Sequence, residues 1–437
     1  MPGARSDSPI RAAEFEAAMA SFAPFPKRPE IALALSGGAD SMALLVLLRA
    51  WTAARAGRLI AFVVDHGLRG ESAAEARRVA ARAEALGVES HILTWHGAKP
   101  SSALQAKART ARYRLLEAAC RERGLLYLAV GHHRDDQAET FLLRLESGSG
   151  PTGLAAMSAL SVRRHLLLLR PLLGFPKARL EALLRAEAVP WVEDPSNRDP
   201  RHRRVVMRAL RASLARHQDA HGGLCQAQGL FARLRSCLER DVLAWLAAAC
   251  HWYPQGYASL DRALLERSSA SLVGPALALV LRTIGGAVYG PAPDRVVRLL
   301  ADLVAGQGST TLSGCRLLLE EEAMLVVRES RAPRDLALKA GLRQHWDRRF
   351  RLQCGGSLAE GLCIRSLTEA GWQRMEPRPD RKGLPAAALW SLPSVWDETG
   401  PLRVPHLAWQ RPEGPSAALS LRFHPLSRPG SAVFAVA

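Results

Sequence analysis

Apolar residues recur along the first half of the chain in short runs separated by longer amphipathic segments. The runs lie at 31–35, 59–65, 91–95, 125–133 and 165–173. Their length is that of buried strands, and the segments between them repeat apolar positions at helical spacing. Strands that alternate with helices predict crossover connections, and therefore a parallel sheet covered on both faces. We expect a five-stranded, doubly wound α/β nucleotide-binding domain over residues 1–216.

The pattern changes after residue 216. Helical periodicity dominates residues 217–327, with a short β-like pair near 308–329. The charged, proline-containing stretch 328–335 predicts a linker. Residues 336–437 carry short β-like pieces rich in Gly, Pro and Trp. We expect a mainly helical middle domain and a small α+β C-terminal domain.

Charge and composition narrow the class of protein. The formal net charge is +18, which favours a polyanionic partner such as nucleic acid; a coding bias toward arginine is the alternative. No apolar run reaches the roughly 18 residues of a membrane span, and the N-terminus has no apolar signal segment. We expect a cytoplasmic protein with no membrane partner. The seven cysteines form no C-x-x-C pair, which argues against zinc ribbons, iron–sulfur sites and disulfide frameworks.

The stretch Ser-Gly-Gly-Ala-Asp-Ser connects the first predicted strand to a helix. A glycine-rich turn entering a helix directs backbone N–H groups and the positive helix end at one place, which suits phosphate. The chain lacks the Walker pattern G-x-x-x-x-G-K-[ST] and the dinucleotide pattern G-x-G-x-x-G. The candidate nucleotide-binding residues of this loop are Ser36, Gly37, Gly38, Ala39, Asp40 and Ser41.

Polar side chains also follow other predicted strands. Asp65 ends the second strand, where it could hold a ribose or an ammonium group, and His132 follows the fourth. Asp136 and Glu139 share one face at the start of the next helix. Acids favour a helix N-terminus because they stabilise the helix dipole, which is a purely structural explanation. Acids directed at a phosphate group would repel it unless a cation, either Mg²⁺ or an ammonium group, lies between them.

Basic residues and a flexible loop accompany these acids. Arg109 and Arg112 lie on one helical face, and residues 201–216 contain six arginines and no acid. Both features suit phosphate, although solvated basic helices are the alternative. The Gly-rich segment 147–157 suits a loop that closes over a nucleotide.

Five motifs occur in the order and spacing of one enzyme family. They are SGGADSMALL, DHGLRGESAAEA, GHHRDDQAETFLLRL, GSGPTGL and DPSNRDPRHRR. The chain resembles the tRNA(Ile)-lysidine synthetases, which belong to the PP-loop ATP pyrophosphatases, densely over residues 30–215. Two positions depart from the family pattern: Val205 stands where Asn is usual, and Gly131 stands where Ala is frequent.

The resemblance implies an activity and a set of roles. These enzymes ligate free lysine to carbon 2 of the wobble cytidine in the CAU anticodon of an isoleucine tRNA, through an adenylated intermediate that consumes ATP. By resemblance, the loop and Asp65 bind ATP, Asp40 holds Mg²⁺, and the two later domains contact tRNA. The implied catalytic residues are Asp40, Arg112, His132, Asp136, Glu139, Arg204 and Arg208.

Two alternatives are weighed against this activity. A PP-loop tRNA 2-thiolation enzyme needs catalytic or cluster-binding cysteines, whereas the nucleotide domain contains only Cys120. A non-catalytic RNA-binding protein with a decayed nucleotide fold should have lost the loop or the acids, and both are intact.

Overall fold

The computed structural model describes the chain over residues 8–68, 70–97, 104–163, 165–192, 203–215, 218–304, 309–331, 333–356, 358–412, 419–427 and 434–436. The chain divides into two compact units. The first comprises Met1–Cys237 with Ala432–Ala437, and the second comprises Leu238–Ser431.

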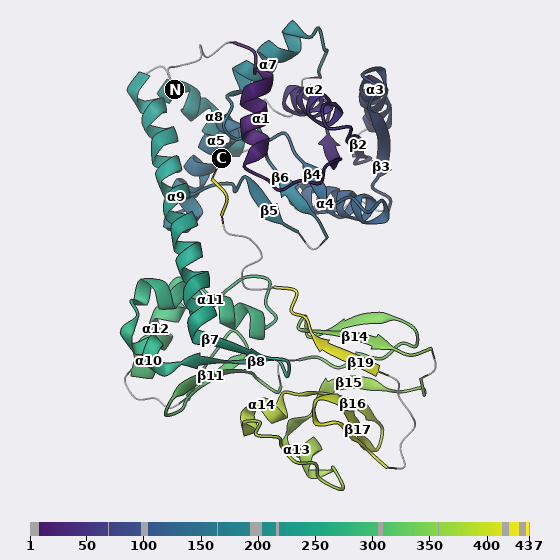
Figure 1. The fold of residues 1–437 in the computed structure, drawn as a ribbon, viewed down its shortest axis with the longest axis vertical. Helices are drawn as coiled ribbons and strands as arrows, with labels where there is room; N and C mark the ends of the chain where they lie inside the picture. Colours follow the sequence, from purple (N-terminus) through teal and green to yellow (C-terminus); the bar gives the residue numbers. More distant parts are fainter. Residues whose placement is uncertain are drawn as a thin grey trace. The chain divides into compact units, whose positions relative to one another are not determined.

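A six-stranded sheet forms the centre of the first unit (Figure 1). In pairing order its strands are β3 (Glu89–Thr94), β2 (Arg58–Asp65), β1 (Glu30–Leu35), β4 (Tyr127–Ala129), β6 (Leu167–Leu169) and β5 (Leu160–Val162). The first five strands are mutually parallel, which confirms the predicted parallel sheet and its five strands. The edge strand β5 is not predicted by the sequence pattern, and it pairs antiparallel with β6.

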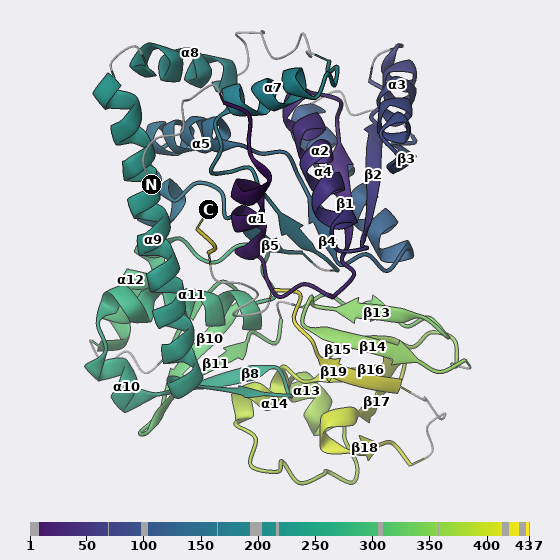
Figure 2. The same ribbon diagram turned by 45° about the horizontal axis from the view of Figure 1, so that its top comes forward.

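Helices connect the strands and cover both faces of the sheet (Figure 2). They are α1 (Ala12–Ala20), α2 (Ala39–Ala53), α3 (Ser72–Ala85), α4 (Leu104–Glu122), α5 (Arg134–Glu146), α6 (Pro151–Leu154), α7 (Lys177–Ala186), α8 (Arg203–Ala215) and α9 (Gln218–Ala249). Side chains alternate along a strand, so β1 directs Ile31 and Leu33 into a core with α2, α3 and α7. Ala32 and Ala34 enter a second core with α4. This is the doubly wound architecture that the alternating pattern predicts.

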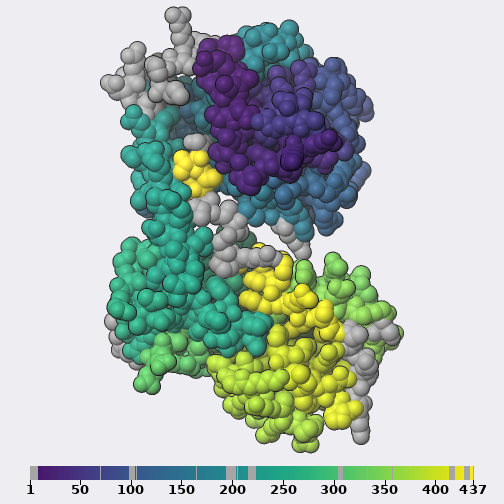
Figure 3. Space-filling view, in the orientation of Figure 1, coloured from purple at the N-terminus to yellow at the C-terminus, as the bar shows by residue number. Residues whose placement is uncertain are grey.

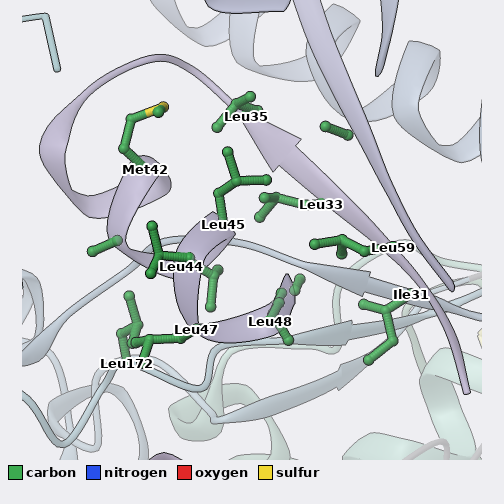
Figure 4. Packing of buried hydrophobic residues seen from close by; sticks show 14 of the residues in the cluster. Ile31, Leu33, Leu35, Met42, Leu44, Leu45, Leu47, Leu48, Leu59 and Leu172 are labelled. Carbon is green, nitrogen blue, oxygen red and sulfur yellow. The ribbon is translucent and has the colours of Figure 1, made fainter. Parts of the chain in front are cut away.

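The larger core fixes the end of β1 relative to the start of α2 (Figure 4). Leu33 of the strand and Leu44, Leu45 and Leu48 of the helix are completely buried. Burying one such side chain contributes about 1.5–3 kcal/mol. The Ser-Gly-Gly turn therefore lies between two elements that packing holds firmly in place.

The second unit contains three antiparallel sheets within the residues described. The first sheet pairs β7 (Cys250–Tyr253), β8 (Tyr257–Asp261), β11 (Ala323–Arg328), β10 (Cys315–Leu319) and β9 (Ser309–Leu312). It packs with α10 (Arg262–Arg267), α11 (Ala270–Ile284) and α12 (Pro293–Val304). This five-stranded sheet is larger than the β pair predicted near 308–329, while the helices are as expected.

The remaining sheets lie in the C-terminal part of that unit. One pairs β12 (Leu336–Ala337), β15 (Cys363–Ser366), β16 (Pro393–Asp397), β17 (Gly400–Val404) and β18 (Trp409–Gln410). The other pairs β13 (Arg343–Trp346), β14 (Phe350–Cys354) and β19 (Leu419–Phe423). Short helices α13 (Thr368–Gln373), α14 (Ala386–Trp390) and η2 (Pro405–Leu407) complete a small α+β arrangement, as the sequence predicts.

The last described residues return to the first unit. Phe434 is buried against Phe231 and Ala232 of α9, and Figure 3 shows this C-terminal segment as a small yellow patch beside that helix. Ala435 accepts a hydrogen bond from the Ala159 amide at 2.9 Å and donates one to Ser158 Oγ at 2.9 Å. Residues 434–436 therefore belong to the packing of the first unit.

None of the helices in the described ranges combines the length and the apolar content needed to cross a membrane.

The core around β1 and α2 makes a testable prediction. Leu45→Ala should lower the free energy of unfolding of the first unit by about 2–5 kcal/mol, because it leaves a cavity in fully buried packing. Urea denaturation followed by tryptophan fluorescence measures this change. Leu145→Ala is the matched control, since Leu145 is 54% exposed and its truncation should change stability by only about 0.5 kcal/mol. Equal losses for both variants would contradict this assignment of the core.

Candidate active site

The loop between β1 and α2 closes on itself through two serines. Ser41 Oγ accepts from the Ser36 amide at 3.2 Å and donates to the Gly38 carbonyl at 3.0 Å. The two serine hydroxyl oxygens lie 3.1 Å apart. Gly38 is the N-cap of α2 and supplies no side chain to its first amides. The loop therefore presents a helix N-terminus without a side-chain cap, which is a ready site for an anion.

Glycine is required at the second position of this loop. Gly37 has φ of 82°, a conformation that side-chain-bearing residues rarely adopt. A Cβ built there would lie 2.4 Å from Val79 Cγ2 of α3. The Gly37 carbonyl also accepts from the Val192 amide at 2.9 Å. Conformation and lack of space thus both explain the glycine at position 37.

A second backbone segment approaches the loop at Gly131. A Cβ at this position would lie 2.9 Å from the Asp40 carbonyl carbon and 3.0 Å from the Ser41 amide nitrogen. Because those are backbone atoms at the start of α2, they have little freedom to give way. The glycine that stands where the family frequently has alanine thus fits the close approach of this turn to the loop.

Asp65 lies at the end of β2, on the same edge of the sheet. It is only 7% exposed, and its Oδ1 accepts from the Gly67 amide at 2.9 Å. The structure therefore places this predicted nucleotide-binding residue in a turn beyond a strand that neighbours β1.

Acidic residues from two βα connections, β1–α2 and β4–α5, meet around His133. The His133 Nε2 atom lies 3.5 Å from Asp40 Oδ1 and 3.7 Å from Asp136 Oδ2. His133 is also the N-cap of α5, where its Nδ1 accepts from the Asp135 amide at 3.2 Å. Asp136 Oδ2 accepts in return from the His133 amide at 3.1 Å. With Nδ1 as an acceptor, the proton of the neutral ring is on Nε2, facing both carboxylates.

The carboxylates change the acidity of this histidine. Burial by itself disfavours the imidazolium form, but Asp40, Asp136 and Asp135 outweigh burial and raise the pKa of His133 above its usual value. Protonation of Nδ1 would break the hydrogen bond from the Asp135 amide, so the cap geometry favours the neutral ring while the carboxylates favour the charged one. In both forms, Nε2 presents a proton to Asp40 and Asp136.

Glu139 is held by an arginine from α8. Its side chain is 2% exposed, and Oε1 accepts from Arg208 Nε at 2.9 Å. Its Oε2 is buried and has no hydrogen-bond partner within the part of the chain that the structure describes. Burial disfavours the Arg208 charge, but Glu139, Asp136 and Asp40 raise its pKa. A second pair, Arg211 Nη1 with Asp135 Oδ2 at 3.5 Å, joins the same two helices.

Arg112 lies on α4 with no carboxylate partner among the described residues. Burial lowers its pKa, the neighbouring Arg109 lowers it further, and Tyr113 opposes the shift. A partly buried guanidinium without a carboxylate has the chemistry to receive an external anion. Arg204 lies within α8, but its side chain is outside the described residues, as is the segment 193–202.

Two residues that sequence reasoning missed organise the site. The sequence singled out His132, which the structure places, partly buried, directly before His133. His133 is the ring that lies between the carboxylates, and its position three residues before Asp136, immediately ahead of a helix, is a capping-box signal. Gln137 is the second: its amide donates to the Met157 carbonyl and accepts from the Met157 amide, both at 2.8 Å. Gln137 thereby attaches the end of the Gly-rich segment 147–157 to α5.

The fold and the loop define the chain's catalytic unit as a nucleotide-binding domain of the PP-loop class. The family model described as a PP-loop domain matches residues 11–214. A tRNA(Ile)-lysidine synthase of Ruegeria pomeroyi is 35% identical over 86% of this chain and 88% of its own length. One of Wolbachia pipientis is 30% identical with the same coverage. The chain therefore belongs to the tRNA(Ile)-lysidine synthase family.

Similarity is strongest in the first half of the chain. A tRNA(Ile)-lysidine synthase of a Bradyrhizobium species is 50% identical over 209 residues, which are 47% of this chain and 58% of that protein. The match to this relative thus spans little more than half of its length.

The geometry of the loop predicts that adding one methyl group at Gly37 weakens nucleotide binding. Gly37→Ala should weaken binding of a non-hydrolysable ATP analogue by at least about tenfold, because the added Cβ is strained by the positive φ and clashes with α3. Isothermal titration calorimetry measures the affinity. Gly174→Ala is the control, since a Cβ there meets no atom within 4 Å. Unchanged affinity of Gly37→Ala would show that this loop does not hold the nucleotide.

Proposed function

We propose that this protein ligates free L-lysine to carbon 2 of the wobble cytidine in the CAU anticodon of an isoleucine tRNA. ATP first adenylates the base, and lysine then displaces AMP, so the products are lysidine, AMP and pyrophosphate. The observation that carries the proposal is the convergence of Asp40, Asp136 and Glu139 beside a loop suited to an anion. The names of the relatives support the same substrate. We place the reaction in the cytoplasm.

In the first step, the cytidine carbonyl oxygen attacks the α-phosphate and pyrophosphate leaves. The amides at the start of α2, with Ser36 and Ser41, hold the β,γ end of ATP. Arg208 and Arg112, together with Arg204, neutralise charge that develops on phosphate oxygens. Asp65 orients the nucleoside part of ATP. His132 assists from the turn before α5.

Asp40 is the residue of this site that fits a Mg²⁺ ligand. It offers hard carboxylate oxygens directly at the loop, and its side chain is 33% exposed. No three His, Cys, Asp or Glu side chains among the described residues are grouped to hold a metal on their own. A Mg²⁺ ion held by Asp40 would need phosphate oxygens and water as its further ligands. When bound, Mg²⁺ neutralises charge on the triphosphate.

In the second step, the lysine ε-amine must lose a proton before it attacks carbon 2. Its unperturbed pKa is about 10.4, so an acidic pocket must first bind the ammonium and then accept a proton. Asp136 and Glu139 serve this role, because Glu139 Oε2 is buried without a hydrogen-bond partner in the described residues. A carboxylate oxygen in that state is well placed to accept from an ammonium group.

The cysteine chemistry disfavours the thiolation alternative. Burial, with a smaller contribution from Glu117, raises the pKa of Cys120 to about 12. The thiol therefore stays protonated and is a poor nucleophile at physiological pH.

The roles of the domains are part of the same proposal: residues 1–216 carry out catalysis, 328–335 form a linker, and 217–327 and 336–437 contact the tRNA.

The activity is tested directly with purified protein. Together with ATP, Mg²⁺, labelled lysine and a transcript of the CAU-anticodon tRNA, it should make lysine acid-precipitable and release AMP. A transcript whose wobble cytidine is replaced by uridine is the control and should accept no lysine. Absence of lysine incorporation into the CAU transcript would contradict the proposed activity.

A variant of Asp136 separates chemistry from folding. Asp136→Asn keeps an oxygen that can accept from the His133 amide, but it removes the charge that would bind an ammonium group. We expect incorporation to fall by about two orders of magnitude or more, with a melting temperature close to that of the wild type. Asp294→Asn is the control, because that carboxylate is 69% exposed on α12. Normal turnover by Asp136→Asn would remove this residue from the active site.

A further inference from the structure

The outer face of the sheet β13–β14–β19 carries a row of basic side chains, in which Arg351 and Arg422 are permanently charged. His345 pairs with Arg351, and Arg351 pairs directly with Arg422, so the three side chains cross the sheet in one line. Both arginines are exposed. Figure 2 shows β13 and β14 side by side, with β19 completing the same sheet. The neighbouring row contains Arg343, Gln353 and Ser420 and no acid.

Folding does not account for this arrangement. Like charges directly opposite each other on antiparallel strands destabilise a sheet. The single acid in these strands and their turns, Asp347, is buried in ion pairs with Arg328 and Arg349. Asp347 therefore does not neutralise the charges of Arg351 and Arg422 on the surface. The opposite face of the sheet is apolar and packed, with Trp346 and Phe350 inside a core, so the cationic face cannot turn inward.

An aromatic hollow adjoins the end of this row. It is lined by Trp252, Tyr253, His406 and Arg422, so Arg422 belongs to both features. The Tyr253 ring stacks on the buried Tyr257 ring with centroids 4.1 Å apart and planes within 5°. Burial lowers the pKa of His406 to about 4. The imidazole is therefore neutral at physiological pH, and the charge at the hollow comes from Arg422.

We propose that this surface binds single-stranded RNA: Arg351 and Arg422, with His345 beside them, contact successive phosphates, and the hollow stacks an unpaired base of the same strand. Arg351 and Arg422 lie on neighbouring strands, whose backbones are about 4.8 Å apart. Their long side chains can therefore reach two neighbouring phosphates of one RNA strand. An aromatic platform at the end of a basic groove is typical of proteins that bind unpaired nucleotides. This inference rests on the proposed function in one respect, that the RNA is the tRNA substrate.

The double variant Arg351→Gln/Arg422→Gln tests the cationic row. Because it relieves a like-charge pair, its melting temperature should equal or exceed that of the wild type. Its Kd for tRNA, measured by filter binding without ATP or lysine, should rise roughly tenfold at physiological salt. The slope of log Kd against log salt should become shallower by about 2. The matched control is Arg77→Gln/Arg78→Gln on α3, which removes the same charge from exposed positions outside the two domains assigned to tRNA contact. It should alter neither the Kd for tRNA nor the salt slope.

The outcomes separate this surface from the catalytic proposal. If the double variant binds tRNA like the wild type, the proposal that this surface binds RNA is wrong, whether or not the protein makes lysidine. If RNA binding falls as expected while the wild type incorporates no lysine, the surface stands and the catalytic proposal fails. If the variant loses affinity for vesicles of anionic phospholipid but not for RNA, the surface is a membrane contact and the inference is wrong.

The stacking hollow has its own test. Tyr253→Leu keeps an apolar side chain but removes the ring, so binding of an unstructured oligoadenylate should weaken by about tenfold. Binding of a fully paired RNA duplex should be unaffected, because it exposes no base to stack. A circular-dichroism melt checks that the variant is folded. Equal binding of oligoadenylate by folded Tyr253→Leu and wild type would remove the hollow from the RNA surface.

Discussion

The contact of one buried imidazole with two carboxylates is the interaction on which the candidate active site depends. His133 is 5% exposed, and its Nε2 faces Asp40 from α2 and Asp136 from α5. These helices follow β1 and β4, which are neighbours in the sheet. Without the ring, two carboxylates would face each other in a region of low dielectric, where their repulsion is strong. The histidine therefore makes it possible to collect acids beside the Ser-Gly-Gly loop.

The same electrostatic requirement explains how the basic helix α8 is placed. Glu139 and Asp135 lie on α5, and Arg208 and Arg211 of α8 pair with them. Charges that would be costly to bury alone thus fasten the two helices together. Arg208 is 40% exposed although it bonds Glu139, so part of its guanidinium stays open toward solvent. One ion pair therefore positions the basic helix beside the acids of α5 while part of the guanidinium remains exposed.

Local patterns were sufficient to predict the framework, but not the contacts within the site. The five parallel strands and the Ser-Gly-Gly loop were recognisable because apolar runs and glycine turns are local signals. The strand β5 has three residues, too few for a periodic signal. Strand β7 starts directly after α9 ends, within the stretch 217–327 that the sequence predicts to be mainly helical, so it had no separate signal. The Glu139–Arg208 bond joins residues 69 positions apart, and no local pattern specifies such a pair. The choice between His132 and His133 depended on the backbone at the helix cap, which orients the His133 ring toward Asp40 and Asp136.

The placement of the acids on α5 also depends on segments remote from it in the chain. Gln137 bonds both backbone groups of Met157, and the next residue, Ser158, accepts a hydrogen bond from the amide of Ala435. Arg170, which directly follows β6, donates a hydrogen bond to the Ser158 carbonyl at 2.6 Å. A glycine-rich segment has high conformational entropy in the unfolded chain, so its ordered end must be fixed by bonds such as these. The segment that leads away from the Gly-rich loop is thus fastened to α5, to the sheet and to the chain's own C-terminal residues. Asp136 and Glu139 flank Gln137 on that helix, and their position relative to the loop follows from these three attachments together with the His133 contact.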